Sequence, residues 1–86
     1  ITASTNFTRA SYGLPPLPHA TVRTYVGYGL SQLMRDLVPG APADEAVARY
    51  REHHERTMEG ATRLLPGVGD TVPELARRGY KLAVCS

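Results

Sequence analysis

Hydrophobic positions recur at helical spacing over most of the chain. The clearest stripe runs from Leu30 to Val38, with apolar residues at i, i+3, i+4, i+7 and i+8, which places them on one face of a helix. A longer helix is expected over residues 43–60. Its predicted buried face consists of Ala43, Ala46, Val47, Tyr50, Thr57 and Met58. These patterns predict a small helical bundle.

Two shorter helices are expected before this pair, at residues 1–12 and 19–26. Gly13 is a suitable end for the first, because glycine adopts the left-handed conformation of a helix terminus without strain. The segment LPPLP at 14–18 contains three prolines and cannot continue a helix. The apolar residues of the first helix that fall near one side are Ile1, Ala3, Phe7 and Ala10.

The last part of the chain follows a different pattern. After the connector LLPGVGD at 64–70, a helix is expected over 70–78, with Asp70 as its cap and Pro73 in its first turn. Residues 80–85 then read as an apolar strand of the kind found in parallel sheets covered on both faces. A lone strand has no sheet, so we expect a mostly helical part of a longer α/β protein.

Composition narrows the possible functions. The chain has 86 residues and a net charge of +2. The charges are dispersed along the sequence, which disfavours nucleic-acid binding. Cys85 is the single cysteine, which fits a reducing cytoplasmic location. No apolar run approaches the roughly 20 residues of a membrane span. The preference for arginine over lysine favours a bacterial source.

Several short motifs are interpreted as structural. HHE at 53–55 lacks the second histidine of a zinc motif, since Met58 stands there, and we expect solvated helix histidines and no metal site. The glycine pairs at 27–29 and 67–69 lack the third glycine of a dinucleotide-binding fingerprint. The Asn6–Thr8 glycosylation sequon lies in a predicted helix, His19 is expected at the surface, and Cys85 is expected in the core.

Ser86 has a different status because it follows the predicted strand. In open α/β sheets, ligands bind at the carboxyl ends of strands. A hydroxyl there can donate to a phosphate oxygen, together with backbone N–H groups. The alternative is a serine that only begins a turn.

The order of three segments resembles one family. GLPPLP followed by VGYG, the connector LPGV, and the strand GYKLAVCS are similar to phosphoglycolate phosphatases of the haloacid dehalogenase-like superfamily. The resemblance implies a helical cap at 1–65 and, at 66–86, a return to an α/β Rossmann-like core through a helix and a strand. It also implies that Ser86 binds the transferred phosphoryl group.

The same resemblance assigns further residues. Gly27, Tyr28 and Gly29 match the cap loop that faces the substrate, with Arg23 as a secondary candidate, and Pro66 and Gly67 match a hinge. The nucleophilic aspartate and the Mg²⁺ ligands would lie outside these 86 residues, which alone are expected to be inactive.

The implied parent is a Mg²⁺-dependent phosphatase acting through an aspartyl-phosphate on a small phosphorylated substrate such as 2-phosphoglycolate. The alternatives are a sugar-phosphate phosphatase or mutase, a phosphonate hydrolase, and a non-catalytic helical interaction module.

Overall fold

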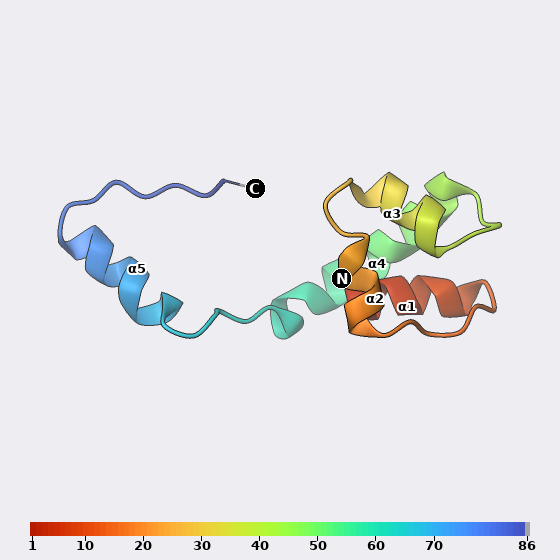
Figure 1. Cartoon of the computed structure of the whole chain (residues 1–86), viewed down its shortest axis with the longest axis horizontal. Coiled ribbons are helices and arrows are strands. Elements are labelled where there is room, and N and C mark those ends of the chain that lie inside the picture. Colours follow the sequence, from red (N-terminus) through yellow and green to blue (C-terminus); the bar gives the residue numbers. More distant parts are fainter. Residues whose placement is uncertain (86) are drawn as a thin grey trace.

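The chain forms five helices in a computed structural model that describes residues 1–85 (Figure 1). They are α1 (Thr2–Ser11), α2 (His19–Thr24), α3 (Leu30–Leu37), α4 (Ala43–Ala61) and α5 (Val68–Arg77). Helices α1 to α4 pack together, whereas α5 stands apart from them at the other end of a molecule that measures 52 × 23 × 18 Å. The predicted helical bundle is confirmed, and it consists of α1–α4.

The core is built on the predicted stripe of α3. Leu33, Met34, Leu37 and Val38 are all buried there. The other apolar residues of the core are Val22 from α2 and Ala46 and Tyr50 from α4. Burial of a large apolar side chain contributes about 1.5–3 kcal/mol, so this stripe is the main source of stability for the bundle.

The predicted inner face of α1 is wrong. Its buried residues are Ser4, Thr5, Thr8 and Arg9, while the apolar set Ile1, Ala3, Phe7 and Ala10 is exposed. Among the described residues two of the three buried hydroxyls of α1 have hydrogen-bond partners, whereas Thr5 Oγ1 has none. The Thr8 hydroxyl donates to the Ser4 carbonyl at 2.9 Å, and the Ser4 hydroxyl lies 2.9 Å from His53 Nδ1 on α4.

Arg9 joins α1 to the end of α3. Its side chain is 7% exposed, and its guanidinium donates to the Leu37 carbonyl and, through Nε, to the Pro15 carbonyl at 2.8 Å. The Leu37 carbonyl belongs to the last turn of α3, where unpaired carbonyls carry the negative end of the helix dipole. Arg9 therefore acts as a C-terminal cap supplied by another helix.

The inner face of α4 follows the prediction over its first half. Ala46 and Tyr50 are buried, and Val47 is half-buried. Met58, predicted to be buried, is exposed, because the last turns of α4 extend beyond the bundle (Figure 1). The paired histidines are half-buried instead of solvated: His53 stacks on Phe7 with centroids 4.5 Å apart, and His54 stacks on Tyr50.

Asn6 holds the proline-rich connector against α1. Its Nδ2 donates to the Leu17 carbonyl at 2.9 Å, and the Leu17 N–H donates to its Oδ1 at 2.8 Å. The left-handed Gly13, with φ of 75°, turns the chain out of α1 into this connector, as predicted. The connector thus returns antiparallel to α1 and delivers α2 to the core.

We predict that Asn6→Ala lowers the free energy of unfolding by about 1–2 kcal/mol, because two partly buried hydrogen bonds are lost. Urea denaturation followed by circular dichroism measures this. The matched control is Gln32→Ala, which removes an amide bonded to Asp36 on the exposed face of α3 and should cost about 0.5 kcal/mol or less. Equal effects of the two substitutions would contradict the role given to Asn6.

The C-terminal part corrects three predictions. Helix α5 begins at Val68, with the left-handed Gly67 as N-cap (φ 85°), so Asp70 lies in the first turn without capping it. Pro73 is consequently inside the helix. Among residues 1–85 no strand is assigned: Tyr80 to Cys85 are unpaired and exposed, with Val84 96% exposed. A strand needs a hydrogen-bonded neighbour, and the described residues supply none.

Candidate functional site

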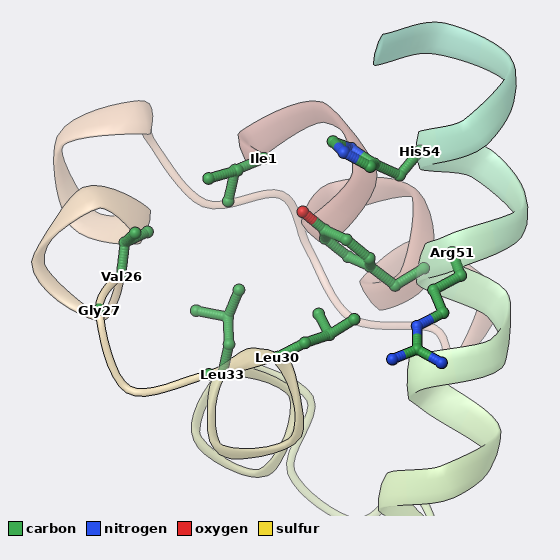
Figure 2. A pocket seen from close by; sticks show the side chains of 9 residues that line it. Ile1, Val26, Gly27, Leu30, Leu33, Arg51 and His54 are labelled. Carbon is green, nitrogen blue, oxygen red and sulfur yellow. The ribbon is translucent and has the colours of Figure 1, made fainter. Parts of the chain in front are cut away.

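An open pocket of about 350 Å³ lies between the α2–α3 loop and α4. Figure 2 shows Val26 and Leu33 on one side and His54 and Arg51 projecting from α4 on the other. Its lining consists of Ile1, Val26, Gly27, Gly29, Leu30, Leu33, Tyr50, Arg51 and His54. The walls are thus mostly apolar, with a few polar groups on α4, which is typical of small-molecule sites.

The glycine loop, residues 27–29, forms one wall of the pocket because of its backbone conformation. Gly27 has φ of 122° and Gly29, the N-cap of α3, has φ of 87°. Side chains disfavour both conformations, so glycine lets the chain reverse between α2 and α3. No side chain caps the first turn of α3. The backbone N–H groups of this turn have no partner within the helix, and the turn starts at this wall of the pocket.

Tyr28 and Arg23 do not line the pocket. Tyr28 is 76% exposed at the tip of the loop, and Arg23 is exposed on α2. The structure therefore brings together Gly27 and Gly29 of the predicted set and leaves Tyr28 and Arg23 outside the pocket. A contact of these four residues with a substrate stays a prediction.

The opposite wall was not predicted from the sequence. Tyr50 is only 5% exposed, and burial raises the pKa of its hydroxyl. The ring of His54 lies against it, with centroids 5.4 Å apart. Arg51, one residue after Tyr50, brings a permanent positive charge to the rim. The spacing of Arg51 and His54, three residues apart on one helix face, was the available signal.

The remaining predicted residues lie away from the pocket. Pro66 and Gly67 form the turn just before α5, after an extended segment that follows α4. A hinge there stays a prediction. Ser86 lies outside the described residues, so its proposed contact with a phosphoryl group is likewise a prediction.

The described residues do not offer a magnesium site. Within 1–85, no group of three or more histidine, cysteine, aspartate or glutamate side chains is arranged to hold a metal ion. Mg²⁺ prefers several oxygen ligands, including carboxylates. The lining of the pocket contains no carboxylate, so this pocket does not fit the ion. None of the helices in this part of the chain is long and apolar enough to cross a membrane.

These features define a class of protein: a helical domain with a small pocket that lies beside a glycine loop and has an arginine, Arg51, at its rim. The sequence profile of the family described as haloacid dehalogenase-like hydrolase matches residues 1–86. The chain belongs to this family, and the resemblance found in the sequence is confirmed. No solved structure matches the chain significantly.

Three bacterial relatives carry the same name. The chain is 34% identical to the plasmid phosphoglycolate phosphatase of Cupriavidus necator, over 96% of the chain and 38% of that protein. It is 29% identical to the phosphoglycolate phosphatase of Agrobacterium fabrum, over 100% of the chain and 40% of the relative. It is 26% identical to the phosphoglycolate phosphatase of Nitrosospira multiformis, over 96% of the chain and 40% of the relative. The chain thus spans about two fifths of the length of these relatives.

Proposed function

We propose that this chain supplies the helical cap and the start of the core of a phosphatase that hydrolyses a small phosphate monoester such as 2-phosphoglycolate. The cap corresponds to residues 1–65 and the return to the core to residues 66–86. The observation that carries the proposal is the pocket between the glycine loop and α4, in a chain whose relatives are named phosphoglycolate phosphatases. The separation of α5 from α1–α4 supports the boundary.

The chemistry belongs to the full-length protein. We propose that an aspartate outside residues 1–86 attacks the phosphorus atom and releases the alcohol, which takes up a proton, and that water then frees inorganic phosphate from the aspartyl-phosphate. Mg²⁺ is expected as the cofactor, bound by residues outside this chain, where it would offset negative charge on the phosphoryl oxygens. Ser86 would hold one of those oxygens.

The described residues would act on the other end of the substrate. The apolar walls of this open pocket would cover part of an organic group and reduce its contact with water. The free N–H groups at the start of α3 and the charge of Arg51 suit an anionic group such as a carboxylate. A single cysteine agrees with a cytoplasmic protein.

Activity of the purified full-length protein tests this proposal. We expect it to release phosphate from 2-phosphoglycolate when Mg²⁺ is present and to lose activity with EDTA. The 86-residue chain alone should release none, because it lacks the nucleophile. A preference for a sugar phosphate or for a phosphonate over 2-phosphoglycolate would move the protein to one of the alternative classes. No turnover of any phosphate ester would leave a non-catalytic module.

A further inference from the structure

The pocket carries a cation that no described acid neutralises. The ion pairs among residues 1–85 join Arg49 to Glu45 on α4, and Arg77 and Arg78 to Glu74 on α5. Arg51 takes part in none of them and makes no side-chain hydrogen bond in this part of the chain. Since the pocket lining contains no carboxylate, the charge of Arg51 is available to an anion that enters the pocket.

Tyr50 adds a polar group that is otherwise unused. Its side chain is buried in the core, and its hydroxyl has no hydrogen-bond partner within the described residues, although the residue lines the pocket. The hydroxyl is not among the buried polar atoms of the described residues that lack a partner, so it is open to water at the pocket. A ligand oxygen that accepts its hydrogen bond would take the place of that water. Successive residues of a helix do not face each other, so Tyr50 and Arg51 offer their donors at separate places in the pocket lining. The carboxylate is assigned to Arg51, and the Tyr50 hydroxyl can bond another oxygen of the ligand.

The pocket is larger than a glycolate unit. At roughly 30 Å³ per non-hydrogen atom, the space of one water in the liquid, glycolate would occupy about 150 Å³. The pocket provides about 350 Å³. The surplus is bounded by Val26, Leu30 and Leu33, and apolar walls favour apolar ligand surface.

We propose that this pocket holds the organic end of the substrate by a carboxylate at Arg51, and that it admits 2-hydroxy acids bearing a small hydrocarbon side chain. The inference rests on the proposed function for the orientation of the substrate, and it widens the substrate class. The phosphate ester of a branched 2-hydroxy acid fits the pocket as well as 2-phosphoglycolate does.

Binding of unphosphorylated acids tests the pocket without any turnover. The probe is 2-hydroxy-3-methylbutanoate, titrated into the ¹⁵N-labelled 86-residue chain, acetylated at Ile1 so that the terminal ammonium cannot bind the acid. We expect shifts centred on the Gly27 and Gly29 amides, with tighter binding than for glycolate. The neutral amide of the same acid should bind about 10-fold more weakly, because it lacks the charge.

Variants assign the charge to Arg51. Arg51→Gln should weaken binding of the acid about 10-fold and leave binding of the amide unchanged. The matched control, Arg35→Gln, removes an exposed arginine of α3 that does not line the pocket, and it should bind the acid like wild type. Both sites are exposed, and far-UV circular dichroism verifies that the helices are retained. Equal binding of acid and amide, or an unchanged Arg51→Gln variant, overturns the proposal.

Kinetics of the full-length protein separate this inference from the proposed function. We expect Arg51→Gln to raise KM for 2-phosphoglycolate about 10-fold with little change in kcat, since the interaction is present in the ground state. We also expect the full-length protein to hydrolyse the phosphate ester of 2-hydroxy-3-methylbutanoate. Leu30→Phe should reduce this activity, because the larger side chain fills part of the pocket. Hydrolysis of 2-phosphoglycolate with KM insensitive to Arg51→Gln overturns the inference alone. Absence of hydrolysis overturns the proposed function, and the binding measurements then decide the inference.

Discussion

Replacing Arg9 with alanine is expected to lower the free energy of unfolding by about 3 kcal/mol, the upper range for hydrogen bonds made by a charged group. The substitution leaves the Leu37 and Pro15 carbonyls without their donor. It also empties the space filled by a buried side chain. Native domains have only about 5–15 kcal/mol of total stability, so the loss of this residue would remove a large part of it.

Urea denaturation of the 86-residue chain measures the effect, with Arg35→Ala as the control. Arg35 is an exposed arginine of α3, and its loss should cost about 0.5 kcal/mol or less. Arg9→Lys should recover only part of the loss, because an ammonium lacks the forked donors that reach two carbonyls. The capping role is refuted if the alanine variants at positions 9 and 35 are equally stable.

Ser86→Ala in the full-length protein is expected to lower kcat/KM for 2-phosphoglycolate by roughly 10-fold to 1,000-fold, the range for one donor to a developing oxyanion. Ser86→Thr keeps the hydroxyl and should retain much of the activity. The free energy of unfolding should change little in both variants. Steady-state kinetics beside denaturation curves provide both readouts.

The contrast between the two Ser86 variants decides the assignment. Equal activity of the alanine and threonine variants would make Ser86 a turn residue. If both variants were inactive and unfolded, the side chain would have a structural role, and the phosphate contact would have to be abandoned.

The parts of the fold with strong local signals were predictable from the sequence. The stripe of α3 repeats at helical spacing with no polar interruption, and four of its residues are buried in the core. The turns at Gly13 and at Gly27–Gly29 were also predictable, because their positive φ angles exclude most other residues. In each case the residues themselves impose the local structure.

Helix α1 shows where this reasoning fails. Its apolar residues were assigned to the core on hydrophobicity alone, yet Ser4, Thr8 and Arg9 face inward. The partners of Ser4 and Arg9 are distant in the sequence, at His53 and Leu37 respectively. A periodicity argument contains no information on such partners. The polar wall of the pocket on α4 was missed for the same reason, since its relation to the glycine loop exists only in the folded bundle.

The apolar segment at residues 80–85 illustrates another limit. Its composition is that of a buried strand, and in the described residues it remains unpaired. Strand formation depends on a neighbouring strand as much as on composition, so a correct propensity does not by itself produce the element.

The isolation of α5 has a consequence for cooperativity. No helix of the described bundle packs extensively on α5, and its ten residues are fewer than the roughly 12–15 that an independent helix needs in water. We expect its amides to exchange by local opening at a low free energy, and those of α1–α4 to exchange mainly when their shared core unfolds. In the 86-residue chain we therefore expect the cooperative thermal transition to report on α1–α4, with little contribution from α5.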